Sequence, residues 1–202
     1  SSAFAAIYPP AEKIPVITVA SFPQLGKLTA LRFIEWVQKN PNGVISLPTG
    51  KTPEYFIKWV LYFTANWHSS DAAKQLEDHG IDTAAKPDFS NLFFVQIDEF
   101  YPIESSQHNS FNCYVKEYYI KGFGLSPENC LLIDSSRIGL AQGEKLSQYW
   151  PAGRVDLTLR YRNPLSTLEE KQKLLMGRVD QWCMEYEKRI RELGGIGFFL
   201  GG

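Results

Sequence analysis

"LFFVQIDEF" (residues 92–100) opens with the clearest strand pattern in the sequence. All but one of residues 92–97 are apolar, and two acidic residues, Asp98 and Glu99, follow them directly. A segment this apolar has no face suited to water, which is typical of a strand covered on both sides, as in parallel sheets. In such sheets ligands bind beyond the carboxyl ends of the strands. The acidic pair therefore lies where we expect a functional site.

The rest of the chain alternates between helical and strand patterns. Helices are predicted over residues 24–40, from 53 to 63, over 111–118 with a C-cap at Lys121-Gly122, and over 182–193; short strands are predicted over 43–47, 131–133 and 197–200. This alternation predicts an α/β fold, a parallel-sheet, doubly wound, Rossmann-like sandwich with helices on both faces. We expect one domain over residues 1–202, with an inserted excursion at 135–180, where no clear core pattern is present.

Composition argues against several classes of partner. The formal net charge is −1, and basic residues are not interleaved with aromatic ones, so we expect no nucleic acid. No apolar run approaches the roughly 20 residues of a membrane span. The cysteines, Cys113, Cys130 and Cys183, are far apart and are predicted to be buried and reduced, which favours the cytoplasm. The histidines show no metal-ligand spacing, so no metal site is predicted.

The segment SLPTGKTPEYF (residues 46–56) contains a GKT triplet that invites comparison with the P-loop of nucleotide-binding proteins. A P-loop requires another glycine five residues before Gly50, and Ile45 stands there, inside a predicted strand. The nucleotide-loop interpretation therefore fails. A junction between strand and helix remains, with Thr52 as the expected N-cap and Pro53 at the first helical position.

Such a junction suits a single phosphate, because free backbone N–H groups, hydroxyls and the positive end of a helix dipole meet there. Thr49, Gly50, Lys51 and Thr52 are the candidate phosphate ligands. Gly50 allows the backbone to approach a ligand closely or to take a positive φ. Lys51 adds a positive charge. The alternative interpretation is an ordinary turn with a good helix cap.

The acidic pair is a second candidate feature. Successive strand residues point to opposite faces, so we expect only one of Asp98 and Glu99 to face a ligand. A partly buried carboxylate beside an acidic C–H group can act as a general base. The alternatives are a solvated loop or a cap for a neighbouring helix. Downstream, His108 is a possible ligand contact or proton relay, or a surface histidine, and Ser110 is a plausible N-cap and possible ligand contact.

Together these segments resemble the glucosamine-6-phosphate deaminase/isomerase family, which is related to the 6-phosphogluconolactonases. The matching pieces are LPTGKTP (47–53), IDEF (97–100), HNSF (108–111), PEN (127–129) and YEKRI (186–190) before GGIGFFLGG. Their order and spacing agree from about residue 43 to 132 and resume near 186. The lactonases typically carry an arginine after the acidic pair. Phe100 stands in that position here, which favours the deaminase branch.

The resemblance implies a function: isomerisation of glucosamine 6-phosphate with deamination, giving fructose 6-phosphate and ammonia. Thr49, Gly50 and Thr52 would hold the phosphate. Asp98 would be the general base that moves a proton from C2 to C1 of the opened sugar. The resemblance implies no organic cofactor and no metal. The expected partner is a small sugar phosphate. Assembly into a homo-oligomer is possible.

Two departures from the family pattern bear on this expectation. The family carries its ring-opening Asp and His in a motif resembling GGxGxDGHIAF, which would continue where the sequence reaches Gly201-Gly202. We therefore expect a sugar-phosphate isomerase-type domain that is truncated at its C-terminus. The excursion at 135–180 is the second departure. Hydrolysis of 6-phosphogluconolactone and binding of a phosphosugar without catalysis stay open as alternatives, and so does enzyme activity of this chain.

Overall fold

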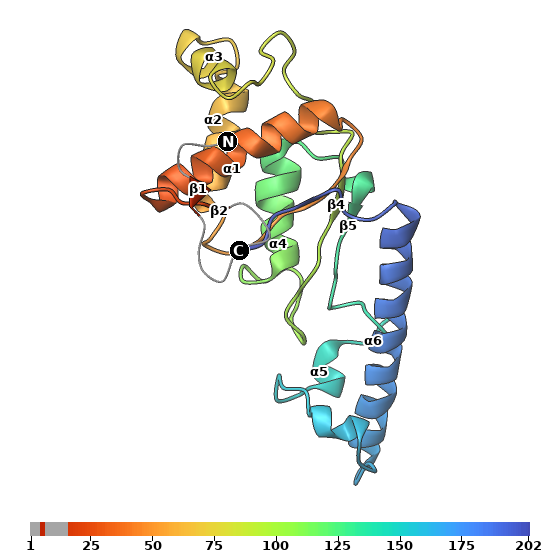
Figure 1. Ribbon diagram of the computed structural model, residues 1–202. Coiled ribbons are helices and arrows are strands. Elements are labelled where there is room, and N and C mark those ends of the chain that lie inside the picture. Colours follow the sequence, from red (N-terminus) through yellow and green to blue (C-terminus); the bar gives the residue numbers. More distant parts are fainter. Residues whose placement is uncertain (1–4, 7–15) are drawn as a thin grey trace. The chain divides into compact units, whose positions relative to one another are not determined.

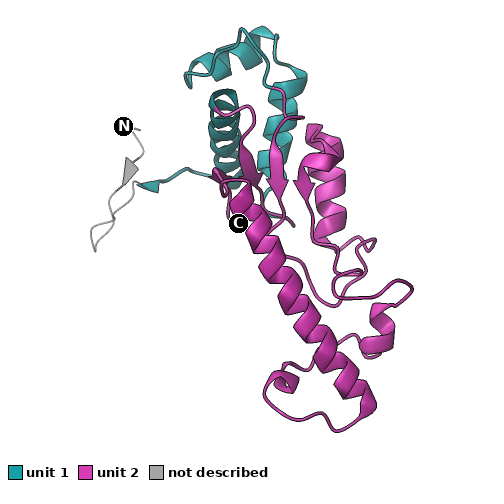
Figure 2. Ribbon diagram, turned by 90° about the vertical axis from the view of Figure 1, so that its right-hand side faces the viewer, with its two compact units in different colours: residues 1–39, 51–87 teal, residues 40–50, 88–202 magenta. Residues whose placement is uncertain are grey.

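The computed structural model describes residues 5–6 and 16–202 (Figure 1). The chain divides into two compact units (Figure 2). One consists of residues up to 39 together with 51–87, and the other of residues 40–50 together with 88–202. The first unit is mainly helical, and the second contains the parallel sheet. That residues 1–202 form one domain stays a prediction.

The first unit is built on a close helix pair. Its elements are β1 (Ala5–Ala6), β2 (Val16–Ile17), α1 (Phe22–Lys39), α2 (Glu54–Ala65) and α3 (Ser70–Glu77), with β1 and β2 paired antiparallel. The helices α1 and α2 pack so closely at Gly26 that an added Cβ atom there would lie 2.5 Å from the Cβ atom of Tyr55. Phe63, Trp67 and Leu76 complete a buried apolar cluster between the helices of this unit.

One predicted helix start is wrong, and one predicted helix cap has another backbone conformation than expected. The helix α2 begins at Glu54, and its N-cap is Pro53 without any side-chain cap, so Thr52 does not cap it. A turn precedes the helix, in which the N–H of Glu54 donates to the carbonyl of Lys51 at 3.3 Å, and this turn delays the helix start. Gly122 is not a left-handed C-cap, since its φ is −71° and the helix continues through it.

The second unit contains a four-stranded sheet. The strands are β3 (Val44–Ser46), β4 (Phe93–Val95), β5 (Cys130–Leu131) and β6 (Phe198–Phe199), and they lie in the order β5–β4–β3–β6. All three pairs are parallel, which confirms the predicted α/β class. The chain moves from β3 to β4 and β5 on one side and returns to place β6 on the other. Such a reversal beside the first strand is a topological switch point, where open α/β sheets bind ligands.

Helices cover both faces of this sheet, as predicted. One face is covered by α4 (Phe111–Val115) and its π-helical continuation η1 (Lys116–Lys121), since Tyr119 lies against Phe94 with ring centroids 5.6 Å apart. The neighbouring strand residue, Val95, points the other way and packs with Tyr186 of α6 (Thr167–Glu192). The apolar strand pattern is therefore explained by burial from both sides.

The predicted excursion at 135–180 contains α5 (Leu146–Tyr149), η3 (Leu157–Arg160) and the first half of α6 (Figure 1). It has its own apolar cluster, which includes Trp150, Leu159 and Leu175. The helix α6 begins at Thr167, well before the predicted start at 182, because its first turns pack against this cluster and not against the sheet. A short 3-10 turn, η2 (Pro127–Asn129), precedes β5.

Strand lengths and cysteine burial also differ from expectation. The strand β4 ends at Val95, and Ile97 is 48% exposed, so this strand is shorter than the apolar run 92–97 suggested. Cys183 is exposed on α6, and the prediction that it is buried is therefore wrong; Cys113 and Cys130 are half-buried. Among the described residues, no helix is both long and apolar enough to cross a membrane.

Candidate functional site

The predicted site residues of the second unit follow neighbouring strands at one edge of the sheet. Thr49 and Gly50 come after β3, and Asp98 comes after β4. Because β3 and β4 are parallel, both segments leave the sheet at its carboxyl edge. The segment after β6 reaches the same edge, where the N–H of Leu200 donates to the carbonyl of Ser46 at 3.0 Å. This edge at the switch point is the candidate site.

The loop after β3 has a backbone that requires glycine. Gly50 has a φ of +83°, in the left-handed region, while no atom lies within 4 Å of an added Cβ. Backbone conformation, and not space, therefore selects glycine here. The start of the loop is fixed by the buried Tyr119, whose hydroxyl donates to the carbonyl of Pro48. Burial raises the pKa of Tyr119, so this hydroxyl stays protonated as a donor.

The remaining candidates for phosphate binding belong to the other compact unit. Lys51 and Thr52 are exposed and precede the first residue of α2. The predicted phosphate loop thus crosses the boundary between the units after Gly50. Thr49 is half-buried beside it. Phosphate binding by the four residues stays a prediction.

Asp98 has a free carboxylate. Its side chain is exposed and accepts no hydrogen bond and forms no ion pair within the described part of the chain. Partial burial raises the pKa of the Asp98 carboxyl, and the negative charge of Glu99 raises it further. A carboxylate that is more basic than usual, and whose oxygens are not already paired, is suited to act as a general base.

Glu99, in contrast, is occupied as a helix cap. One of its oxygens, Oε1, accepts from the N–H groups of Phe100 at 2.9 Å and Phe111 at 3.0 Å. The other, Oε2, accepts from the N–H of Asn112 at 2.8 Å and the hydroxyl of Ser110 at 2.7 Å. These four bonds use the acceptor positions of the carboxylate. The carboxylate of Glu99 is therefore occupied and that of Asp98 is not, while the prediction that one of them faces a ligand stays a prediction.

The two candidates downstream lie at the same helix start. Ser110 is the N-cap of α4, as predicted, and its hydroxyl accepts from the N–H of Cys113 at 3.4 Å. It is 1% exposed, so a ligand does not reach it in this conformation. His108 is exposed in the preceding turn. Ligand contacts by His108, Ser110 and Glu99 stay predictions.

Two residues that support the site were missed by the sequence analysis. Gln96 is buried, and its side-chain amide donates to the carbonyl of Asp98 at 2.9 Å. The hydroxyl of Tyr186, on α6, lies 2.7 Å from the carbonyl of Gln96. A signal for the first was available, because Gln96 is the polar residue within the apolar run 92–97. Tyr186 lies in the helix predicted over residues 182–193, and nothing in the sequence indicated its hydrogen bond.

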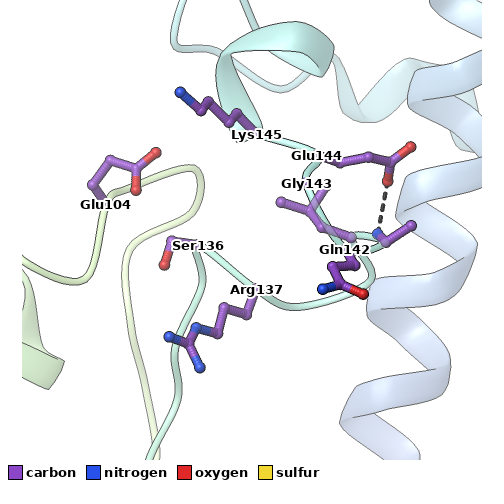
Figure 3. A pocket seen from close by; sticks show the side chains of 9 residues that line it. Glu104, Ser136, Arg137, Gln142, Gly143, Glu144 and Lys145 are labelled. Atoms are coloured by element: carbon purple, nitrogen blue, oxygen red, sulfur yellow. Dashed lines mark hydrogen bonds between the residues drawn. The ribbon is translucent and has the colours of Figure 1, made fainter.

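A polar cleft lies between residues 136–145 of the excursion and the loop that carries Glu104 (Figure 3). It measures about 780 Å³ and is lined by charged side chains of both signs, Glu104, Glu144, Arg137 and Lys145. Glu144 already accepts from the N–H of Ala141 at 2.7 Å, drawn as the dashed line in Figure 3. The lining contains none of the predicted site residues and has no excess of either charge. It therefore favours no ligand class.

Comparison with known proteins supports the architecture. No protein-family model matches the chain, and no curated protein matches it. A solved structure of a monomeric glucosamine-6-phosphate deaminase, described as a missing link of the NagB superfamily, matches with a TM-score of 0.53 at 16% identity. The fold is shared with a glucosamine-6-phosphate deaminase. The match covers 88% of this chain and 50% of the other, so the chain spans about half the length of that protein.

Proposed function

We propose that this chain carries the general base and the phosphate loop of an enzyme that converts glucosamine 6-phosphate to fructose 6-phosphate and ammonia. The observation that carries the proposal is the free carboxylate of Asp98 at the carboxyl end of β4, beside the strand that leads to Gly50. The fold shared with a glucosamine-6-phosphate deaminase supports it.

In the proposed reaction, Asp98 acts on the open-chain sugar. Its carboxylate removes the proton from C2, which the neighbouring aldehyde at C1 makes acidic, while the C1 oxygen takes up a proton from water and an enolamine forms. The protonated carboxyl then returns its proton to C1, and the nitrogen loses a proton to water. The product is an imine at C2, and water adds to this carbon and releases ammonia. One positioned carboxylate typically contributes about 10²–10⁴-fold to the rate of such a proton transfer. The raised pKa of Asp98 favours this role, because it makes the carboxylate a stronger base.

The loop after β3 would hold the phosphate. Gly50 has the left-handed backbone that turns N–H groups toward an anion in many phosphate loops, and Thr49 adds a hydroxyl. Lys51 and Thr52 would complete the contacts from the adjoining residues. When the phosphate is held at one end of the substrate, the reacting carbons at the other end are held near the base. Binding of the phosphate thus orients the substrate for proton transfer.

The test is the release of ammonia from glucosamine 6-phosphate by the wild-type chain and by Asp98→Asn. We expect kcat to fall by about 10²–10⁴-fold in the variant. A matched control is Asp134→Asn, because Asp134 follows β5 at the same edge but already accepts from Ser136 and faces Arg137. This control is expected to keep most of the activity.

Three outcomes separate the proposal from its alternatives. Wild-type activity that Asp98→Asn abolishes, and Asp134→Asn retains, supports the proposal. Equal activity in wild type and Asp98→Asn would remove Asp98 from the mechanism. Saturable binding of the sugar phosphate in calorimetry, with no ammonia released by the wild type, would favour a phosphosugar-binding role.

A further inference from the structure

We propose that Gln96 is a positioning residue for Asp98, holding the backbone of the base candidate through its side-chain amide. The inference rests on the proposed function for its catalytic consequence. Its structural part concerns where the carboxylate of Asp98 is held, and that part can be measured without any substrate.

The position of Asp98 is set through its backbone. Its carboxylate has no hydrogen-bond partner among the described residues, so no side-chain contact fixes it in place. The strand β4 has already ended at Val95, so the sheet ladder does not extend to Asp98. The contact that holds this residue is the bond from Nε2 of Gln96 to its carbonyl oxygen, at 2.9 Å.

Gln96 is itself held at each of its polar groups. Its Oε1 accepts from the N–H of Ile133 at 3.0 Å, and its own N–H donates to the carbonyl of Leu131 at 3.0 Å. Its carbonyl accepts from the hydroxyl of Tyr186 at 2.7 Å. The side chain is 2% exposed. Both polar atoms of this buried side-chain amide have a hydrogen-bond partner, and turning the amide away would lose these bonds where water cannot replace them.

These contacts connect Asp98 to two other elements of the sheet unit. Ile133 and Leu131 belong to β5 and the segment after it, and Tyr186 belongs to α6, where its hydroxyl also lies 2.7 Å from the carbonyl of Leu131. Gln96 therefore connects the turn that carries Asp98 to β5 and α6 through hydrogen bonds, and these elements fix the position of the turn. Displacement of a catalytic group by about 1 Å can lower the rate by about 10²-fold, so even a small movement of Asp98 would affect catalysis.

The primary variant is Gln96→Met, which keeps the chain length and removes both the donor and the acceptor. Its matched control is Asn129→Leu. The amide of Asn129 donates to the carbonyl of Ser90 at 3.2 Å and so connects the amino ends of the same two strands, away from Asp98. Both variants remove one amide bridge between the segments flanking β4 and β5, and they differ in the end of the sheet that is affected.

The first readout is the titration of the Asp98 carboxyl, followed by carbon-13 NMR in the chain without substrate. In Gln96→Met we expect the midpoint to move down toward the ordinary value of an aspartate, because a released turn admits more water around the carboxyl. Asn129→Leu is expected to leave the midpoint unchanged. A folded Gln96→Met chain with the wild-type midpoint would overturn the proposal.

A second variant covers the case in which Gln96→Met does not fold. Tyr186→Phe keeps the packing of the ring and removes only the hydroxyl, which lies 2.7 Å from the carbonyls of both Gln96 and Leu131. A smaller shift of the Asp98 midpoint in the same direction is expected. An unchanged midpoint in Tyr186→Phe would then count against the proposal.

Kinetics separate this inference from the proposed function. If the wild type releases ammonia, Gln96→Met is expected to lower kcat by about 10²-fold with little change in KM, because the phosphate loop is untouched. Asn129→Leu is expected to keep the wild-type kcat. If the wild type releases none, the proposed function fails, while the NMR titration still decides whether Gln96 positions Asp98.

Discussion

Ser110 donates its hydroxyl hydrogen to Oε2 of Glu99 at 2.7 Å, joining the start of α4 to the segment that follows β4. The same serine caps the helix through Cys113, so one side chain both accepts from the helix and donates to the strand segment. This pairing separates two acidic residues that are neighbours in the sequence. Glu99 holds the structure, and Asp98 keeps a free carboxylate.

Replacing Glu99 is expected to destabilise the protein. Glu99→Ala removes four hydrogen bonds and leaves the buried hydroxyl of Ser110 without its acceptor. We expect a loss of about 1–3 kcal/mol in the free energy of unfolding, measured by urea titration. The control is Glu104→Ala, an exposed acid, which is expected to change stability little. Equal stability of the two variants would contradict the capping role.

Asp98→Asn is expected to be more stable than the wild type at neutral pH. The folded state raises the pKa of Asp98, so it binds a proton more readily than the unfolded state does. Stability from this group is therefore lost as pH rises from the ordinary aspartate pKa through the raised one. The neutral asparagine escapes that loss. Urea titrations at pH 7 and below pH 4 should show an advantage for the variant that shrinks at the lower pH.

Glu169 is expected to have the opposite pH dependence. Its hydrogen bonds with Arg162, at 2.8 Å, lower the pKa of the Glu169 carboxyl to about 2, from an ordinary value of 4.5. Its stabilising effect is complete above pH 4.5 and is lost as the pH falls toward 2. In Glu169→Gln this part of the acid dependence should be absent. Glu170→Gln, at the exposed neighbour, should behave like the wild type.

Two glycines in helices are expected to respond in opposite directions to alanine. Gly26→Ala forces a Cβ atom against Tyr55 and the backbone N of Phe56, at 2.5 and 2.7 Å, and should cost about 1–3 kcal/mol. At Gly177 of α6 no atom lies within 4 Å of an added Cβ atom, so alanine should stabilise by about 0.5–1 kcal/mol. Thermal unfolding of both variants tests the close approach of α1 and α2.

The sequence predicted the elements that depend on apolar periodicity. The run around Phe94 and Val95 indicated a strand covered on both faces, and the structure places η1 against one face and α6 against the other. The early start of α6 was not predictable in this way. Its first turns pack on the excursion, where Leu175 of the helix and Leu159 before it belong to one buried cluster, and no local pattern records such packing.

The site could be predicted in type but not in arrangement. Strand ends and turn chemistry pointed to Asp98 and Gly50, because their residue types are unusual beside buried strands. Which of the two acids is free could not be read from the sequence, since the answer depends on the N–H groups that α4 presents to Glu99. The role of Gln96 depends likewise on Ile133, a residue on another strand segment.

In the proposed function, Asp98 moves the proton at C2 of glucosamine 6-phosphate. The most direct measurement follows the C2 proton of this sugar by NMR in deuterium oxide, with the wild type and with Asp98→Asn. We predict that the wild type exchanges or transfers this proton and that Asp98→Asn slows the process by about 10²–10⁴-fold. Equal rates in the two folded proteins would contradict it.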